Sequence, residues 1–410
     1  MPRARTLLVG YVSRPFGLAR VTQALANQLA ERREVHVLAL DSDQPDAAAS
    51  VPPSRGAWTL HLNRDPADLF AEWALENLVA KLRPRSVVLY HDPWYVIRLL
   101  RSVTRARTAV VAYCPLDGEI ARDDIARGLR RLDGLAVPTG FARAAMLEAA
   151  RRCGIEEARP FDSIAVLPHG NDTRTFGPRC GEPSDYRQRR VRARQRLFPH
   201  EPHRWSGFWV VNANASSERK QLDTTLRGFA GFAATAPDAR LYLHWGAANG
   251  DARLVGMAHR MGIADRVVFG PAASDTSAER LNLVYNAGDV GVNTSIGEGW
   301  GLVAFEHAAT SAPQIVPDHT ACSELWRGSA ILLPAARKTT ANGLTTGWSV
   351  DAPALTGALT QLHQRPALYA ALARRALMRA SDPSFDWRRV GTAWEDWLRD
   401  VEARRRLRDR

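Results

Sequence analysis

The sequence predicts an α/β protein with two doubly wound parallel-sheet domains, and three observations lead to this fold class. The chain has 410 residues, which is more than one ordinary hydrophobic core accommodates. Short apolar runs alternate with helix-length segments in both halves of the chain. A stretch rich in proline and arginine, residues 176–205, separates the two series. We expect domains over residues 1–200 and 201–384 that face each other across a central cleft, followed by a C-terminal helix over 385–410.

The first half of the chain is typical of a series of βα units. Residues 6–12 form a continuous apolar run, and a loop that contains Gly17 leads from it into a helical pattern. Strands that are buried on both faces of a parallel sheet are apolar throughout, so this pattern indicates a parallel strand followed by its helix. Further apolar runs occur at residues 35–40, 86–90, 109–113, 134–137 and 164–167.

The second half repeats this rhythm and ends in a helix. Apolar runs that predict strands occur at residues 208–211, 241–244, 266–269, 290–292 and 314–316. Near the C-terminus, the spacing alternates between three and four positions at Trp387, Val390, Trp394, Trp397 and Val401. This spacing predicts an amphipathic helix with three tryptophans on one side, which we expect to pack back onto the body of the protein.

The formal net charge is +12, and a basic surface attracts nucleic acid, anionic lipid or phosphorylated ligands. Nearly all of this charge is arginine spread along the chain, since the lysines are only Lys81, Lys220 and Lys338. We therefore do not expect a nucleic-acid partner. The arginine-rich tail over residues 404–410 has two interpretations, a solvated and frayed end or a peripheral contact with a membrane surface.

The sequence has no run of about 18 or more apolar residues and no apolar leader after basic residues at its N-terminus. We therefore expect a soluble, cytoplasmic protein. The four cysteines are scattered without a CxxC pair, at Cys114, Cys153, Cys180 and Cys322. That pattern indicates neither a zinc site nor a disulfide framework, and we expect reduced thiols.

The most distinctive segment is a glycine-rich turn between an apolar run and a helical pattern, residues 289–306. Its glycines permit positive φ angles and a close approach to a ligand. Glu298 lies in the turn and Glu306 about two helical turns further on. A helix that starts near Gly301 presents free N–H groups and its positive dipole end to an anion. The alternative is a tight βα connection with a solvated glutamate, but the strand before the turn and the apolar helix after it favour a phosphate-binding loop.

Two further motifs accompany this turn. The segment 166–172 is VLPHGND and is followed by Phe176, and the sequence Arg219-Lys220-Gln221-Leu222-Asp223 precedes an amphipathic helical pattern. Together with the glycine-rich turn, these motifs resemble those of the retaining GT-B glycosyltransferases of sequence family four, in the same order and with the expected separations. The resemblance covers nearly the whole chain. It implies two Rossmann-like domains, an acceptor-side domain followed by a donor-binding domain.

The resemblance also implies roles for residues of the second domain. Arg219 and Lys220 would clamp the donor diphosphate, a role that suits a bidentate guanidinium beside an ammonium point charge. The alternative for this basic pair is a solvated helix start. Glu306 would accept hydrogen bonds from the ribose, and Glu298 would hold hydroxyls of the transferred sugar. The turn Gly299-Trp300-Gly301-Leu302 would line the donor site, with backbone N–H groups that stabilise charge on the leaving diphosphate.

Three residues of the first domain are candidates for the acceptor side of the site. Gly17 resembles the family's loop after the first strand, and Asp117 occupies a strand end where many relatives carry a PxDG sequence. His91 follows the carboxyl end of another predicted strand, where open α/β sheets bind their ligands. The structural alternatives are a simple turn at Gly17 and a buried structural histidine at His91. The chain departs from the family at Ala215, where many members place an arginine, and at residues 114–117, where others place a histidine.

The activity implied by the resemblance is transfer of a glycosyl group from a nucleoside diphosphate sugar to a hydroxyl acceptor, with retention at the anomeric carbon. The acceptor would be a glycan, a glycolipid or a small natural product. No nucleophile is well placed, and we expect neither a metal nor another cofactor. The DxD sequence at residues 41–43 is expected to act as a cap or turn. The alternatives are a non-catalytic sugar-nucleotide binding protein, an epimerase on the same fold and a basic polyanion binder.

Overall fold

The computed structural model describes most of the chain and divides it into two compact units. The described residues are 3–13, 17–41, 58–103, 108–179, 185–244, 252–270, 277–340 and 343–408. Unit 1 comprises Met1–Gly170, Asn342–Thr345 and Ser384–Arg410, and unit 2 comprises Asn171–Ala341 and Thr346–Pro383. Residues 171–200, which lie on the first-domain side of the expected boundary, are thus counted with unit 2.

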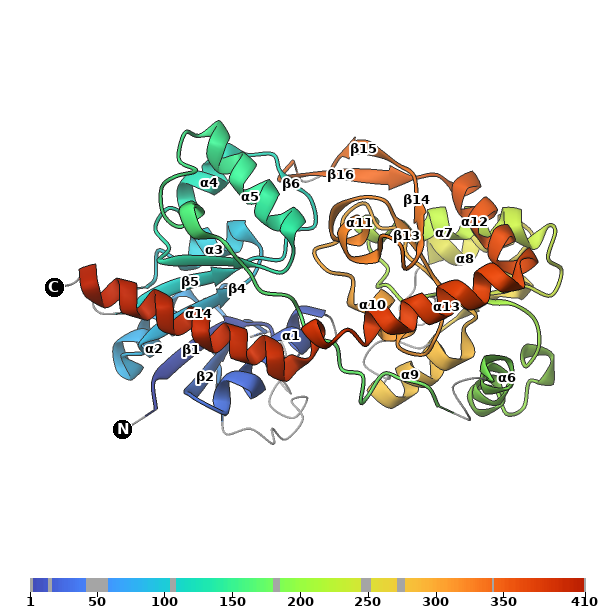
Figure 1. The fold of residues 1–410 in the computed structure, drawn as a ribbon, viewed down its shortest axis with the longest axis horizontal. Coiled ribbons are helices and arrows are strands. Elements are labelled where there is room, and N and C mark those ends of the chain that lie inside the picture. The colour runs from blue at the N-terminus through green and yellow to red at the C-terminus, as the bar shows by residue number, and fades with distance from the viewer. Residues whose placement is uncertain are drawn as a thin grey trace. The chain divides into compact units, whose positions relative to one another are not determined.

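Unit 1 is built on a seven-stranded sheet with the order β3-β2-β1-β4-β5-β7-β8, and its described pairs run parallel. Figure 1 labels its strands β2, β1, β4 and β5. The strands are β1 (Arg5–Gly10), β2 (Glu34–Ala39), β3 (Trp58–Leu62), β4 (Ser86–Tyr90), β5 (Ala109–Tyr113), β7 (Gly134–Val137) and β8 (Ala165–Val166). Each apolar run predicted in the first half overlaps one of these strands. The prediction missed β3, an edge strand whose side chains are half-buried or exposed, because it lacks a continuous apolar run.

Helices cover the sheet of unit 1, which explains the apolar character of its central strands. The helices are α1 (Gly17–Ala30), α2 (Glu72–Leu82), α3 (Pro93–Leu99), α4 (Asp123–Leu129), α5 (Gly140–Arg152) and α14 (Trp387–Arg408), with the short elements β6 (Glu119–Ile120) and η1 (Phe161–Ser163). All five residues of β4 are buried. At the start of α5, the Thr139 side chain accepts a hydrogen bond from the Ala142 N–H and caps the helix.

Unit 2 repeats the architecture with a six-stranded sheet of order β11-β10-β9-β12-β13-β14, whose paired strands are parallel. The strands are β9 (Trp209–Asn212), β10 (Arg240–Leu243), β11 (Val267–Phe269), β12 (Val290–Val292), β13 (Gln314–Pro317) and β14 (Ile331–Leu333). The first five match predicted runs, and β14 was not predicted. A hairpin follows, in which β15 (Ala335–Thr339) pairs antiparallel with β16 (Thr345–Val350).

The helices of unit 2 flank this sheet. They are α6 (Tyr186–Leu197), α7 (Leu222–Ala233), α8 (Ala252–Arg260), α9 (Ala278–Ala287), α10 (Leu302–Ala308), α11 (Thr320–Trp326), α12 (Ala352–Gln364) and α13 (Pro366–Ala380), with the 3-10 turns η2 (Pro202–Arg204), η3 (Glu218–Lys220) and η5 (Ala264–Arg266). A further turn, η7 (Pro383–Phe385), precedes α14. The core is apolar, and Phe229, Leu241 and Leu355 are fully buried within it.

Each sheet has one place where the strand order reverses. In unit 1 the chain winds outward from β1 through β2 to β3 and then returns to place β4 on the other side of β1. In unit 2 it winds from β9 through β10 to β11 and then places β12 on the other side of β9. The connections after two such strands lead to helices on opposite faces of the sheet, and α/β proteins bind ligands at the carboxyl ends of these strands. We therefore expect a site in unit 2 at the loops after β9 and β12.

The C-terminal helix α14 lies beside α1 in unit 1 (Figure 1). Trp394, Leu398 and Val401 are buried, whereas Trp387 and Trp397 are half-buried. The helix therefore contributes an apolar stripe to unit 1.

The basic tail is helical as far as Arg408. Residues 404–408 belong to the last turns of the helix, and Arg405 and Arg408 lie 3.5 and 3.2 Å from the buried Asp133 carboxylate. Residues 409–410 lie outside the described residues. Among the described helices, none is long and apolar enough to cross a membrane. Cys114, Cys153 and Cys322 are free thiols, and Cys180 lies outside the described residues.

A buried ion-pair cluster also fastens α14 to unit 1. The Arg33 side chain is 1% exposed, and it lies 2.5 Å from a carboxylate oxygen of Glu395 and 2.5 Å from one of Glu402, both on α14. The guanidinium also donates to the Thr6 hydroxyl at 3.1 Å. Buried charges of this kind are tolerated only when they are paired and hydrogen-bonded.

Replacement of Arg33 by methionine is expected to destabilise the protein strongly. Two carboxylates would remain buried without their shared cation, which costs about 3–5 kcal/mol. Urea unfolding measures the loss. Arg32→Met removes an exposed arginine from the same turn and is expected to change the free energy of unfolding by less than about 0.5 kcal/mol. Equal effects of the two substitutions would contradict the assignment.

Candidate functional site

The candidate site of unit 2 lies at the carboxyl ends of β9 and β12, which are parallel neighbours. The chain leaves β9 through residues 213–217 into η3, which contains Arg219 and Lys220. It leaves β12 through residues 293–301 into α10. Because parallel neighbours end at the same edge of a sheet, the two loops meet, although some 80 positions separate them.

Glu298 is the centre of this meeting point. Its Oε1 atom lies 2.5 Å from the Lys220 Nζ atom, and it also accepts hydrogen bonds from Asn293 Nδ2 at 3.0 Å and Ser295 Oγ at 2.8 Å. Its Oε2 atom lies 3.5 Å from an Arg219 Nη1 atom. The residue is 5% exposed, so the carboxylate is held on several sides and almost removed from water. The structure thus brings together three of the predicted site residues.

Hydrogen bonds to backbone carbonyls join the two loops directly. Arg219 Nη1 donates to the Gly297 carbonyl at 2.6 Å, and the Ile296 N–H donates to the Arg219 carbonyl at 2.9 Å. The Thr294 hydroxyl reaches the carbonyls of Lys220 at 3.1 Å and Gln221 at 2.9 Å. The basic pair is therefore not a solvated helix start, since both of its residues are tied to the glycine-rich turn.

The charges around Glu298 control its protonation. Burial alone would raise the pKa of the Glu298 carboxyl, but the positive charges of Lys220 and Arg219 and the hydrogen bonds that it accepts lower its pKa to about 2. Glu298 is therefore ionised at neutral pH. An ionised carboxylate is a strong hydrogen-bond acceptor and a very weak base.

Two residues that follow β13, His319 and Thr320, hold the glycine-rich turn in place. They were not among the predicted site residues. The Thr320 hydroxyl accepts the Glu298 N–H at 3.2 Å and lies 3.1 Å from His319 Nδ1. His319 Nε2 lies 3.0 Å from the Ser295 carbonyl, so Nε2 carries the proton and Nδ1 accepts one from Thr320. Burial lowers the pKa of His319 to about 4, which keeps it neutral. Thr320 has φ 48, a region that β-branched residues rarely adopt.

One sequence signal pointed to these two residues. His319 and Thr320 follow the predicted strand at 314–316, and the carboxyl end of that strand meets the same sheet edge as β9 and β12. A polar pair at such an edge is a candidate for the site on the same grounds as His91.

The rest of the glycine-rich turn leads into α10. Gly301 has φ 89 and precedes the helix as its N-cap, which explains the need for glycine. Trp300 is 3% exposed and stacks on Phe305 with ring centroids 5.2 Å apart, so its ring packs on the adjoining helix. Gly299 is buried and Leu302 half-buried. These residues are thus packed within the turn and against α10.

Glu306 lies within α10 and is also mostly buried, at 8% exposed. Its carboxylate accepts a hydrogen bond from the Tyr285 hydroxyl of α9 at 2.9 Å. The Tyr285 ring in turn stacks on His307 at 5.3 Å. The two glutamates therefore have different surroundings, cations beside Glu298 and a tyrosine hydroxyl beside Glu306.

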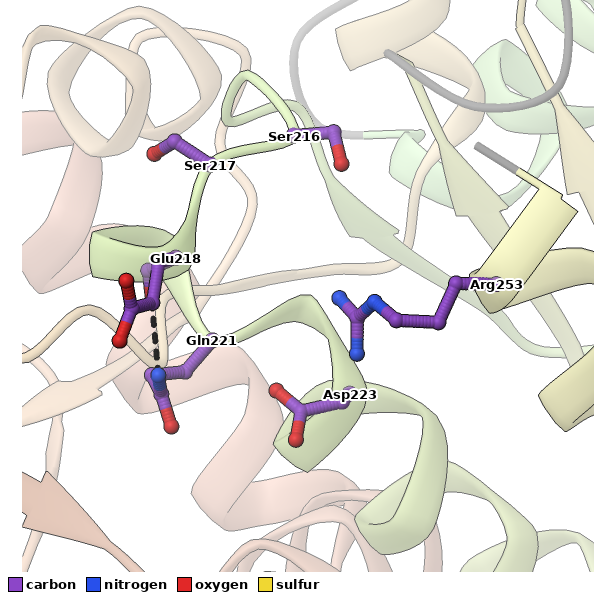
Figure 2. Close-up of a pocket in the computed structure, with 6 residues that line it drawn as sticks. All are labelled: Ser216, Ser217, Glu218, Gln221, Asp223 and Arg253. Carbon is purple, nitrogen blue, oxygen red and sulfur yellow. Dashed lines mark hydrogen bonds between the residues drawn. The ribbon is translucent and has the colours of Figure 1, made fainter. Parts of the chain in front are cut away.

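A cavity of about 340 Å³ adjoins the basic pair (Figure 2). It is lined by Ser216, Ser217, Glu218, Gln221, Asp223 and Arg253. Figure 2 shows the Arg253 guanidinium, from α8, directed toward the Asp223 carboxylate at the start of α7. The volume is within the range of about 300–1,000 Å³ that small-molecule sites occupy. The cavity is polar and lies next to η3, so it extends the candidate site beyond Lys220.

The predicted site residues of unit 1 lie in segments that follow strands of the unit 1 sheet. Gly17 is the first residue of α1, just after residues 14–16, which lie outside the described residues. Asp117 follows β5 and is half-buried. Ser42 and Asp43 of the DxD sequence also lie outside the described residues. Asp41 accepts hydrogen bonds from the N–H groups of Val12 and Ser13 and thereby fixes the loop after β1.

His91 is a buried, neutral histidine at the carboxyl end of β4. It is 3% exposed, and burial lowers its pKa to about 4. Nδ1 accepts the Asp92 N–H at 2.7 Å, so the proton resides on Nε2. Within the described part of the chain, Nε2 has no hydrogen-bond partner. A buried donor without a partner costs free energy, which favours a ligand contact over a purely structural role.

A metal site would need several His, Cys, Asp or Glu side chains close together among the described residues. No group of three or more His, Cys, Asp or Glu side chains there is placed to hold a metal ion.

Comparisons with known proteins identify the fold. The chain has the same fold as several solved glycosyltransferase structures over almost its whole length. Anabaena Alr3699/HepE, solved with UDP and glucose, has a TM-score of 0.73 at 15% identity and covers 97% of this chain and 100% of its own. Sucrose-phosphate synthase from Thermosynechococcus elongatus has a TM-score of 0.72 at 18% identity and covers 98% and 100%. Trehalose 6-phosphate synthase from Burkholderia multivorans has a TM-score of 0.69 at 16% identity and covers 98% and 99%.

The fold is that of the GT-B glycosyltransferases, as the sequence predicted. At the level of sequence, 163 residues are 29% identical to mannosylfructose-phosphate synthase from Agrobacterium fabrum. This match spans 38% of the chain and 33% of that enzyme, so the chain covers about a third of the relative's length. No family model matches the sequence.

The pKa of Glu298 predicts how stability depends on pH. The folded pKa of about 2 lies below the ordinary value of 4.5, so the stabilisation is complete above pH 4.5 and is lost as the pH falls toward 2. Glu298→Gln is therefore expected to lower the free energy of unfolding at pH 7 by on the order of 2–3 kcal/mol, and this deficit shrinks in acid. Urea unfolding between pH 7 and pH 3 measures the difference in free energy of unfolding between the variant and the original chain.

The control for this experiment is Glu148→Gln, which changes an exposed glutamate of α5. Its effect is expected to be small at every pH. A deficit of Glu298→Gln that stays constant across the pH range would show that the carboxylate charge is not the stabilising feature.

Proposed function

We propose that this protein is a retaining glycosyltransferase that transfers a sugar from a nucleoside diphosphate sugar, of the UDP-sugar class, to a hydroxyl acceptor. One observation carries the proposal: an ionised, buried Glu298 is held against Lys220 and Arg219 at the strand-order reversal of unit 2. A sugar nucleotide needs both features, cations for its diphosphate and an acceptor for its sugar hydroxyls. The shared GT-B fold and the UDP and glucose in the Alr3699/HepE structure support it.

In this proposal the basic pair binds the diphosphate. Lys220 is anchored by Glu298 and presents a fixed ammonium, whereas the Arg219 side chain is 39% exposed and accessible to a phosphate from solvent. Backbone N–H groups at the start of α10, near Gly301 and Leu302, add neutral donors. Positive charge that is fixed before the reaction stabilises the leaving diphosphate without reorganisation.

Glu298 orients the transferred sugar and does not act as the nucleophile. Lys220, Asn293 and Ser295 all engage its Oε1 atom, and a carboxylate with a pKa near 2 is a weak base and a poor nucleophile. This supports retention through the leaving phosphate, which would take the acceptor proton on the same face of the sugar. The proton then leaves with the diphosphate, and the new glycosidic bond forms as the bond to the diphosphate breaks.

The roles of the other predicted residues are proposed from where they lie in the structure. Glu306 would bind the ribose hydroxyls, and the cavity of Figure 2 would receive part of the nucleoside. On the acceptor side we propose Gly17, His91 and Asp117, with the Nε2–H of His91, which has no partner among the described residues, as a donor to a hydroxyl oxygen.

The proposed reaction needs no metal ion or other cofactor, because Arg219 and Lys220 supply the positive charge. The acceptor is a glycan, a glycolipid or a small natural product. We place the enzyme in the cytoplasm, with the basic end of α14 as a candidate for peripheral membrane contact.

A thermal-shift screen of nucleoside diphosphate sugars tests the donor. A ligand present at about 100 times its dissociation constant is expected to stabilise the fold by about 2.7 kcal/mol. The best donor is then incubated with candidate acceptors. Release of nucleoside diphosphate only when an acceptor is present supports transfer, whereas donor binding without any turnover indicates a binding protein. Conversion of the sugar without an acceptor indicates an epimerase.

Substitutions are expected to separate donor binding from turnover. Lys220→Ala and Glu306→Ala should weaken donor binding by about tenfold or more, because each removes a charged hydrogen-bonding partner. Glu298→Ala should mainly lower kcat, by about a hundredfold, because its contact is to the reacting sugar. Donor titration and initial rates measure the two effects.

Matched controls are exposed residues of the same types, Lys338→Ala on β15 and Glu148→Ala on α5. Both are expected to retain the binding and turnover of the original chain. Because Lys220→Ala removes one of the two cations beside Glu298, thermal unfolding of each variant accompanies the kinetics. Wild-type transfer by all three site variants would show that the site lies elsewhere.

A further inference from the structure

A second cavity, of about 370 Å³, lies at the opposite edge of the sheet in unit 2. Its wall includes Phe208, which immediately precedes β9, and Asp289, which immediately precedes β12. Glu298 and Lys220 follow the other ends of the same two strands. The cavity is therefore separate from the proposed donor site, because the length of the strands lies between them.

Two buried arginines of α6 dominate the charge of this cavity. Arg190 and Arg194 are each 2% exposed, and both pair with Asp289, at 3.3 Å and 2.5 Å. Two guanidiniums thus share one carboxylate. A third arginine, Arg187, is exposed at the rim, where the exposed Asp238 also lies. The lining carries an excess of positive charge, and buried charge of one sign is stabilised by a counter-ion.

The buried guanidiniums are held rigidly in place. Arg194 donates to the carbonyls of Ala287 and Gly207, both at 2.9 Å. Arg190 donates to the carbonyls of Gly288 and Ser311. The Arg190 Nε atom is buried and forms the 3.3 Å ion pair with Asp289. A rigid cationic wall is preorganised for an anion.

The rest of the cavity suits the body of a small organic molecule. The rings of Tyr186 and Tyr369 lie 5.1 Å apart at 30°, and Phe208 and Pro366 add apolar surface. The volume is within the range of about 300–1,000 Å³ that small-molecule sites occupy. An anionic head group at the arginines would leave its ring or chain against the aromatic wall.

We propose that this cavity binds a small phosphomonoester, with its phosphate at Arg187 and Arg190 and its body against Tyr186 and Tyr369. Phosphate fits better than other anions of this size, because guanidinium forks match its oxygens and its double charge offsets more than one cation. The site is additional to the donor and acceptor sites proposed above and does not depend on them.

Isothermal titration of the full chain tests this site with two probes, inorganic phosphate and phenyl phosphate. Both are expected to bind, and phenyl phosphate more tightly, since its ring reaches the aromatic wall. Arg187→Glu reverses a rim charge without touching the core and should weaken both probes by about tenfold. Val191→Glu, which adds a carboxylate at the exposed edge of the cavity, should do the same.

The matched control is Arg192→Glu, an exposed arginine of the same helix that does not line the cavity. It makes the same change of net charge and should alter affinity by less than about twofold. Lys220→Ala should leave binding unchanged, which distinguishes this cavity from the donor site. The proposal is overturned if neither probe shows saturable binding, if Arg192→Glu weakens binding as much as Arg187→Glu, or if Lys220→Ala abolishes it.

Discussion

The parallel pairing of β9 with β12 is the constraint on which the rest of unit 2 depends. At one edge of the sheet it brings the loop of Lys220 against the loop of Glu298, and at the other it brings Asp289 beside Phe208. Neither arrangement arises from neighbours in sequence. Strand order reverses here, and α/β proteins bind ligands at the carboxyl ends of strands at such a point. A cavity adjoins each edge, one beside the Lys220 loop and one beside Asp289.

The ion pair between Lys220 and Glu298 decides what chemistry this edge supports. A carboxylate buried alone would be protonated near neutral pH, whereas one held by a lysine, an arginine and two neutral donors stays ionised. The pair thereby converts Glu298 from a potential acid or nucleophile into a fixed hydrogen-bond acceptor. Thr320, despite its strained backbone, holds the N–H of the same residue. Strain at such a position persists only where the surroundings determine it, and it is common at functional sites.

Helix α6 buries several of its arginines, although arginine is usually exposed. In the sequence, residues 176–205 are the stretch rich in proline and arginine that separates the two series of strands. Yet Arg190 and Arg194 are buried, and they donate to backbone carbonyls near the starts of β9 and β12. Hydropathy places arginine outside, and only the carbonyls and carboxylate of a folded neighbour make its burial tolerable. Edge strand β3 was missed for a related reason, since it is only half-buried.

The sequence by itself determined the α/β class, most of the strands and the identity of the residues at the candidate site. Buried parallel strands must be apolar, and turns with positive φ favour glycine, so both leave local signals. The tertiary structure alone decided which of those residues meet. It placed Lys220, Arg219 and Glu298 in contact, stacked Trp300 on Phe305, and added His319 and Thr320. The reason is physical: charge, burial and protonation depend on neighbours that lie far away along the chain, and only the paired strands bring them together.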